Sequence, residues 1–183
     1  MVVGVLALQG GFDAHARVLR SLGADVREVR VPADLEGLDG LVMPGGESTT
    51  MTLGIEREGL AEPLRSLVGS GTPVLGTCAG LIMLDRDHLG LLDVRAERNA
   101  FGRQLHSFET DLDIDGAPVH AVFIRAPWVA EHGDDVEVLA SVDGHPVAVR
   151  QQNMLAVSFH PELSGDTALH ERFLDAIRRR ARA

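Results

Sequence analysis

The chain has 183 residues, a length that suits one core within a single domain spanning 1–183. It carries 27 acidic and 17 basic residues, so its formal charge of −10 disfavours nucleic acid as a partner. Its single cysteine cannot form an intrachain disulfide. The sequence shows no secretory signal and no apolar run of the roughly 20 residues that span a bilayer. We therefore expect a cytoplasmic protein that does not associate with membranes.

Strands and helices alternate through the first half of the sequence. Four apolar segments bounded by turn residues have the composition of buried parallel strands, namely 2–8, 25–31, 38–43 and 73–77. Helices are expected around 14–22 and from about Ser48 and Ala79. This alternation predicts an open, mostly parallel α/β sheet flanked by helices.

The second half of the sequence has a different pattern. Beyond Asp85 come short alternating segments typical of antiparallel or mixed strands, at 108–114, 119–124, 136–142 and 146–149. The chain closes with a strand at 156–159 and a helix from about Asp166, whose arginine-rich end complements the helix dipole. We therefore predict one α/β sheet with a β-rich insertion in its second half.

The only cysteine, Cys78, stands in the segment GTCAG, between the strand at 73–77 and the helix from Ala79. Ligands of open α/β sheets sit beyond the carboxyl ends of the strands. G-x-C-x-G has the form of a nucleophile elbow, in which Gly76 and Gly80 allow a sharp turn and leave room for an approaching substrate. A buried cysteine acting as a small hydrophobe gives the same pattern, so GTCAG alone leaves both roles open.

The best candidate for a general base is His160, in the segment SFHPE that ends the last strand. In extended backbone, residues i and i+2 project to the same side, so Glu162 can lie beside His160 and orient its ring. The other seven histidines lack such a strand-end position and are interpreted as surface or core residues; they stand at 15, 88, 106, 120, 132, 145 and 170. The pattern favours a base with its orienting carboxylate.

Motifs for metals and nucleotides are missing from the sequence. It contains no H-E-x-x-H and no paired cysteines, which disfavours a zinc site. The glycine-rich segment PGGES at 44–48 fits neither of the common phosphate-binding patterns, although its backbone N–H groups are suited to an anion or an oxyanion. We expect neither a metal nor a cofactor.

The combination of these segments is more specific than any one of them. The order PGGES, GTCAG and SFHPE resembles the class I glutamine amidotransferases, which have a Cys-His-Glu triad on a flavodoxin-like sheet. The segments GVLALQGG, PGGESTTM, GTCAGLI, ERNAFGRQ, FIRAP and SFHPEL together resemble the glutaminase subunits of pyridoxal 5′-phosphate synthases. ERNAFGRQ and FIRAP separate this family from the glutaminases of histidine, purine or anthranilate synthesis.

This resemblance implies a role for each matching residue. Cys78 would attack the γ-carboxamide of L-glutamine, His160 would move the proton, and Glu162 would hold the imidazole. The backbone N–H groups of Gly46 and Ala79 would form the oxyanion hole. The residues that would bind L-glutamine are Gly46, Glu47, Ser48, Arg98, Ile124 and Arg125. A guanidinium suits the α-carboxylate of glutamine, and which arginine contacts it stays open.

Two departures from the family pattern limit this transfer. Relatives often carry a longer loop where this chain has only Asp85, Arg86 and Asp87, so a contact beside the elbow would differ. Relatives also place an acidic residue where this chain has Ala14, so a local ion pair would be missing.

Ammonia released into bulk water would be lost, which implies a partner. The resemblance names it as the synthase subunit that builds pyridoxal 5′-phosphate from ammonia, a pentose phosphate and a triose phosphate. Three alternatives stay open: the glutaminase subunit of another amidotransferase, a stand-alone cysteine hydrolase of the dienelactone type, and a non-catalytic binding module.

Overall fold

The computed structural model describes residues 1–102 and 107–183. Arg103 and Gln104 of the ERNAFGRQ segment, together with His106, lie outside the described residues. None of the helices in these two ranges is long and apolar enough to cross a membrane.

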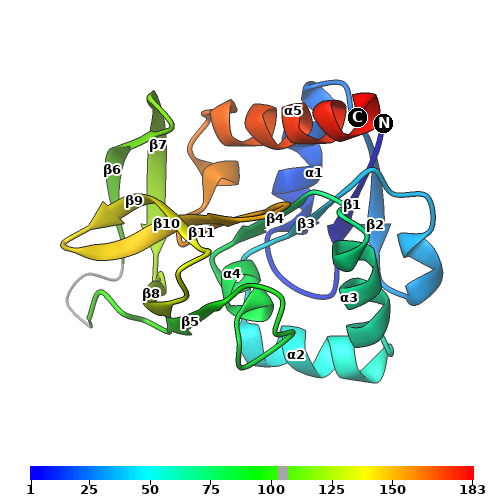
Figure 1. Cartoon of the computed structure of the whole chain (residues 1–183), viewed down its shortest axis with the longest axis horizontal. Helices are drawn as coiled ribbons and strands as arrows, with labels where there is room; N and C mark the ends of the chain where they lie inside the picture. Colours follow the sequence, from blue (N-terminus) through cyan, green and yellow to red (C-terminus); the bar gives the residue numbers. More distant parts are fainter. Residues whose placement is uncertain (103–106) are drawn as a thin grey trace.

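A seven-stranded sheet runs through the centre of the molecule (Figure 1). Its order is β2-β1-β3-β4-β11-β10-β9. Five strands are parallel, namely β1 (Val2–Leu6), β2 (Asp25–Val29), β3 (Gly40–Met43), β4 (Val74–Thr77) and β11 (Met154–Val157). β9 (Glu137–Val142) and β10 (His145–Gln151) add antiparallel strands at one edge. The predicted parallel sheet is confirmed.

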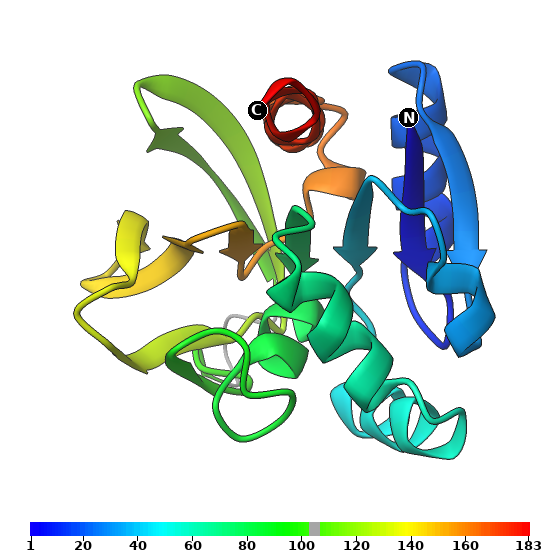
Figure 2. The ribbon, with the colours of Figure 1, turned by 45° about the vertical axis from the view of Figure 1, so that its right-hand side comes forward.

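Helices cover both faces of the sheet, as Figures 1 and 2 show. They are α1 (Phe12–Ser21), α2 (Ser48–Arg57), α3 (Ala61–Gly69), α4 (Ala79–Leu84) and α5 (Ala168–Arg182). Leu41 and Met43 of β3 pack into the cluster with α2, α3 and α4, while Val42 packs into the cluster with α1 and α5. This alternation follows from the two-residue period of a strand and makes a three-layer molecule.

The β-rich insertion is also confirmed, and it has two parts. β6 (Ser107–Ile114) and β7 (Ala117–Ile124) form an antiparallel pair, as do β5 (Val94–Glu97) and β8 (Trp128–His132). β9 and β10 instead extend the central sheet. The insertion separates β4 from β11 in sequence, although these strands are neighbours with Leu75 opposite Leu155.

Several elements differ from the sequence-based expectation. α3, β5 and β8 were not predicted, and the last strand ends at Val157 instead of residue 159. Pro63 argues against a helix in the sequence, but it lies in the first turn of α3, where the backbone N–H that proline lacks would have no intrahelical acceptor. Among the described residues there are also two 3-10 helices, η1 (Pro32–Leu35) and η2 (Pro161–Leu163).

Candidate active site

Cys78 lies at the junction of β4 and α4, at the carboxyl edge of the parallel strands. It is the N-cap residue of α4 and has φ 50° and ψ −107°, a left-handed conformation that is uncommon for a residue with a side chain. Its backbone N–H donates to the carbonyl of Val157 at 2.8 Å, which ties the elbow to β11. Backbone strain of this kind persists where the surrounding structure holds it and is frequent at functional sites.

The glycines that flank Cys78 act differently from the expectation. A Cβ on Gly80 would overlap the carbonyl oxygen of Met43, and one on Gly76 would press on Leu84 and on the backbone of Gly80. They therefore allow α4 to pack directly against β3 and β4, whereas the turn itself is made by the positive φ of Cys78. These contacts are with the protein itself, so they do not indicate that the two glycines make room for a substrate.

His160 and Glu162 make the predicted contact, with Nδ1 of His160 2.7 Å from Oε1 of Glu162. The geometric reason given from the sequence is wrong, because Glu162 lies in η2 and not in extended backbone. A 3-10 turn starting at Pro161 folds the carboxylate back onto the ring of His160, the residue that caps the turn. The side chain of Glu162 is 1% exposed and that of His160 is 13% exposed.

The charges of the two side chains stabilise each other. Burial alone would lower the pKa of His160, but hydrogen bonds with Cys78 and Glu162 outweigh it and raise this pKa to about 10. Burial would raise the pKa of Glu162, yet the hydrogen bond with His160 and nearby imidazoles bring it below its usual value. The arrangement therefore favours an imidazolium at His160, held between the sulfur of Cys78 and a carboxylate.

A cavity of about 390 Å³ opens over Cys78 and His160. All six residues implied for glutamine binding line it, as does Ala79. These six are Gly46, Glu47, Ser48, Arg98, Ile124 and Arg125. They come from the loop after β3, the segment after β5 and the end of β7, so three regions far apart in sequence meet at one edge of the sheet.

The charged residues of this cavity differ in how they are engaged. Glu47 caps α2, accepting from Thr49 N and Thr50 N, and the bonds to Thr50 hold its pKa at about 2. Arg98 pairs with Glu47 at 3.3 Å. Arg125 has φ 45° and, within the described ranges, makes no ion pair. Its guanidinium is thus the more available of the two arginines for a carboxylate.

The loop after β3 is held by the N-terminal glycine loop. Gly11 N–H donates to the carbonyl of Gly45 at 2.9 Å, and Glu47 N–H donates to Oε1 of Gln9 at 2.6 Å. A Cβ on Gly46 would overlap that Gln9 oxygen. The carbonyl and the N–H of one trans peptide point in opposite directions, so the bond from Gly11 fixes where the N–H of Gly46 is aimed.

A buried histidine was missed by sequence reasoning. His15 of α1, interpreted as a surface or core residue, is fully buried with Nε2 3.3 Å from Oε2 of Glu162. A signal was available, because His15 is four residues before Leu19 and seven before Leu22 and so shares the apolar face of the helix. A polar side chain on a buried face needs a partner.

The short loop at Asp85, Arg86 and Asp87 is closed by its own contacts. Asp85 accepts from Asp87 N at 2.9 Å and faces His88 Nδ1 at 2.8 Å. None of the three residues is among the described residues that line the cavity over Cys78. The expected difference beside the elbow thus falls outside this cavity, and the effect of Ala14 stays a prediction.

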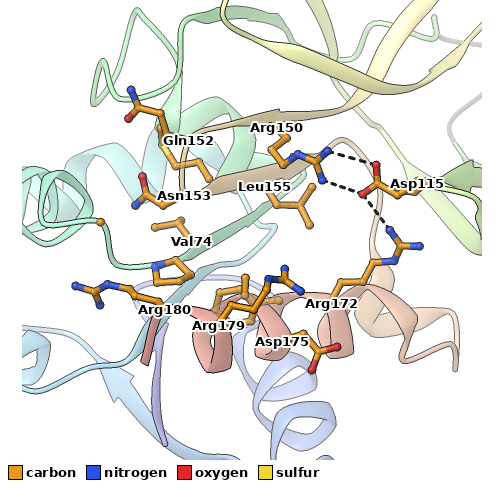
Figure 3. A pocket seen from close by; sticks show the side chains of 16 residues that line it. Val74, Asp115, Arg150, Gln152, Asn153, Leu155, Arg172, Asp175, Arg179 and Arg180 are labelled. Carbon is orange, nitrogen blue, oxygen red and sulfur yellow. Dashed lines mark hydrogen bonds and ion pairs between the residues drawn. The ribbon is translucent and has the colours of Figure 1, made fainter. Parts of the chain in front are cut away.

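A larger cavity, of about 440 Å³, lies at the opposite ends of β4 and β11 (Figure 3). Arg150 and Arg172 reach Asp115 there at 2.8 and 3.2 Å, and Arg179 makes no ion pair with the residues described. Its lining within those residues holds no cysteine or histidine. The larger cavity therefore lacks the nucleophile and base that the smaller one contains.

Comparisons with known proteins identify the family to which this chain is similar. The model of the SNO glutamine amidotransferase family matches residues 5–179. A relative from Parafrankia sp. (strain EAN1pec), named pyridoxal 5'-phosphate synthase subunit PdxT, is 55% identical over 96% of this chain and 93% of its own. Another of that name, from Corynebacterium jeikeium (strain K411), is 54% identical over 98% of each chain.

Solved structures give the same picture of the fold. One described as the crystal structure of glutamine amidotransferase is 47% identical, with a TM-score of 0.91 over 97% of this chain and 99% of that chain. PurLQS from Thermotoga maritima is 17% identical with a TM-score of 0.75 over 98% of each chain, a likeness of fold alone. The expected class I amidotransferase fold is confirmed.

Proposed function

The chain belongs to the SNO glutamine amidotransferase family, and we propose that it is the glutaminase subunit of a pyridoxal 5′-phosphate synthase. It hydrolyses L-glutamine to L-glutamate and ammonia. The observation that carries this function is the contact of His160 with Glu162 at 2.7 Å beside the strained elbow of Cys78. A thiol, a base and an orienting carboxylate are the parts that acyl transfer from an amide requires.

The reaction proceeds in two steps. The Cys78 sulfur attacks the γ-carbonyl carbon of glutamine, and His160, holding the thiol proton, gives it to the departing nitrogen, so that ammonia leaves and a γ-glutamyl thioester remains. A water molecule then loses a proton to His160 and attacks the thioester. Glutamate departs, and the thiol regains its proton. Glu162 stays ionised throughout and holds His160 in the productive tautomer.

The carbonyl oxygen of glutamine gains negative charge in both steps. In our proposal the backbone N–H groups of Ala79, at the start of α4, and of Gly46 hold that oxygen. Arg125 holds the α-carboxylate of glutamine, because its guanidinium is free of ion pairs among the described residues. Arg98 positions Glu47, whose backbone lines the cavity with Ser48 and Ile124.

The product requires a partner. Free ammonia would be protonated in water, so the chain passes it to the synthase subunit through a closed route. We place this complex in the cytoplasm, where a lone thiol stays reduced. The negative charge of the chain makes nucleic acid an unsuitable partner.

The test is to capture the thioester. The chain, mixed with its synthase subunit, is incubated with L-glutamine, quenched in acid and analysed by mass spectrometry. We expect a γ-glutamyl adduct on Cys78, the only cysteine, and no adduct in Cys78→Ala. Release of ammonia without an adduct would contradict the covalent route. Hydrolysis of simple esters without a partner would favour a stand-alone hydrolase, and copurification with a different synthase would favour another amidotransferase.

A further inference from the structure

Two buried imidazoles lie directly behind the Glu162 carboxylate. His15 comes from α1 and His170 from α5, and both residues are 0% exposed. They are neighbours across the layer that covers one face of the sheet, with ring centroids 5.1 Å apart. A buried polar side chain is destabilising unless it has a hydrogen-bond partner, so we expect these two histidines to have partners.

The atoms of this pair form a chain that ends on the carboxylate. His170 Nε2 lies 2.9 Å from His15 Nδ1. On the other side of its ring, His15 Nε2 lies 3.3 Å from Glu162 Oε2 and 3.1 Å from Thr77 Oγ1. Glu162 uses Oε1 for His160, whereas Oε2 is buried and has no hydrogen-bond partner among the described residues. His15 Nε2 is the nearby nitrogen that can supply one, although in this structure its hydrogen bond is with Thr77.

The chemistry of the carboxylate selects one arrangement of protons. An ionised carboxylate only accepts hydrogen bonds, so His15 can donate to Glu162 only with its proton on Nε2, where the Thr77 hydroxyl can also accept it. His15 Nδ1 is then an acceptor, and His170 Nε2–H donates to it. This leaves a bare lone pair on His170 Nδ1, which is the buried ring nitrogen that has no partner among the described residues. The opposite tautomer would aim a lone pair at Glu162.

Both imidazoles are neutral near pH 7. Burial lowers the pKa of His15 to about 4, although the charge of Glu162 opposes it, and lowers the pKa of His170 to about 3. A neutral donor holds a carboxylate oxygen in place without cancelling its charge. A cationic His15 would pair with Glu162 and weaken the attraction between Glu162 and His160.

The titratable groups around Glu162 come from α1, η2, α4, α5 and the segment before α5. They are His15 of α1, His160 before η2, Cys78 at the start of α4, His170 of α5, and Asp166, which acts on His170 from the segment before α5. Of these, only His15 contacts Oε2 of the carboxylate.

We propose that His15 is a positioning residue of the catalytic triad, which holds the second oxygen of Glu162 through its Nε2–H while His170 fixes the tautomer of His15. The inference rests on the proposed function, which gives Glu162 its role. The unit therefore runs from Cys78 through His160 and Glu162 into the layer of α1 and α5.

Two substitutions separate positioning from packing. His15→Leu removes the donor and keeps the bulk, whereas His15→Gln places an amide N–H close to the original Nε2. With the synthase subunit present, we expect His15→Leu to lower kcat for glutamine about tenfold with KM little changed, and His15→Gln to recover most of the loss. His170→Leu should give a smaller loss in the same direction.

The pH profile supplies a readout that packing alone would not move. Without its donor the Glu162 carboxylate is less stabilised, so its pKa rises, and it loses its charge at a higher pH during acidification. The acid limb of kcat/KM should move up by about one pH unit in His15→Leu, and less in His15→Gln. The alkylation rate of Cys78 by iodoacetamide, measured against pH, should shift in parallel, because the chain has no other thiol.

Leu19→Ala is the matched control, since Leu19 is a buried residue of α1 that contributes to the apolar core. It should lower stability but leave the pH limb and the kcat of the folded protein unchanged. A His15→Leu protein that behaves like Leu19→Ala would overturn the proposal. If His15→Leu does not fold, an unshifted limb in His170→Leu would overturn it. Cys78→Ala, assayed beside them, reports on the proposed function: turnover there would reject both ideas.

Discussion

The two ends of β4 and β11 carry cavities of similar size and opposite character. Beyond the carboxyl ends lie Cys78 and His160 with a carboxylate and two imidazoles buried behind them. At the amino ends lies the larger cavity, where Arg150 and Asp115 meet in half-exposed ion pairs (Figure 3). The volume of a cavity therefore does not identify the active site, whereas the burial of ionisable side chains does.

The difference has a physical cause. Charges at the amino ends are solvated, so pairing changes their energies little. Groups at the carboxyl ends have lost most of their water, so each depends on its neighbour, and their pKa values move far from the usual values. Substitutions at the two ends should therefore differ in kind.

The largest effect is expected from Cys78→Ala. Removal of the nucleophile should lower glutamine turnover by about 10⁶-fold, as loss of a member of such a unit does elsewhere. The fold should persist, because one sulfur atom is a small loss of packing. Ammonia release with the synthase subunit present, beside a thermal unfolding curve, checks both statements. Arg179→Ala in the larger cavity is the control and should retain full activity.

Glu162→Gln should come next, with a loss of about 10⁴-fold, because an amide no longer stabilises the imidazolium of His160. Glutamine binding should survive, since Glu162 does not line the cavity. His160→Asn should lose at least as much. The double variant, assayed with the singles, should fall no further than the worse of them; fully additive losses would mean that the residues act separately.

Gly46→Val should cost about 10²- to 10³-fold in activity with the synthase bound, the value of one oxyanion donor. A side chain there would overlap Oε1 of Gln9 and disturb the peptide that carries the donor.

We expect the unmodified chain to hydrolyse glutamine slowly alone and at least about tenfold faster with the synthase subunit. Steady-state ammonia release and a binding titration separate activation from docking. Equal rates with and without the synthase would reject gating by the partner.

Acid should destabilise the molecule through its catalytic end. The pKa values of His15 and His170 are lowered from 6.5 to about 4 and 3, so the unfolded chain binds more protons than the folded chain below pH 6.5. Unfolding free energy should fall by about 2–4 kcal/mol between pH 6.5 and 4.5. The raised pKa of His160 opposes this loss only slightly, because in the unfolded chain His160 is already about half protonated at pH 6.5 and almost fully protonated at pH 4.5.

Denaturant titrations between pH 6.5 and 4.5 measure how steeply the unfolding free energy depends on pH. His15→Leu should flatten it, and His120→Gln, which changes a surface histidine paired with Asp111, should not. An equally steep slope in His15→Leu would exclude the buried imidazole as its source.

The smallest effect is expected at the larger cavity. Arg150→Ala removes ion pairs with Asp115 and Glu137, yet its side chain is 40% exposed, so stability should fall by less than about 1 kcal/mol. Activity should be unchanged. Loss of activity in this variant would contradict the separation of the two ends.

Local sequence signals were enough for the parallel strands, and they selected the candidates for the triad, whose roles came from the family resemblance. Apolar runs bounded by turns located β1 to β4, and GTCAG and SFHPE identified Cys78, His160 and Glu162. These signals act within a few residues, so a single sequence contains them. The residues expected to bind glutamine came from the family resemblance, because only the folded chain brings Arg98 and Arg125 to one cavity.

Features made by packing between distant elements could not be predicted. The partner of His15 is a carboxylate from η2, 147 positions away, and no periodicity in α1 points to it. The short strand β5 has charged residues at both Arg95 and Glu97, and only its pairing with β8 makes it a strand. The backbone of Cys78 is strained because β3 and β11 fix both sides of it, which local propensity does not encode.

The pairing of β4 with β11 also determines at which stage of its synthesis the protein becomes active. Leu75 and Leu155 are neighbours in the sheet although the whole insertion lies between them in sequence. Contacts between residues so far apart close a long loop and form late in folding. A growing chain on the ribosome thus carries its thiol before the strand that brings His160 exists. Glutamine hydrolysis begins only after β11 and His160 have been synthesised, so a nascent chain that lacks them consumes no glutamine.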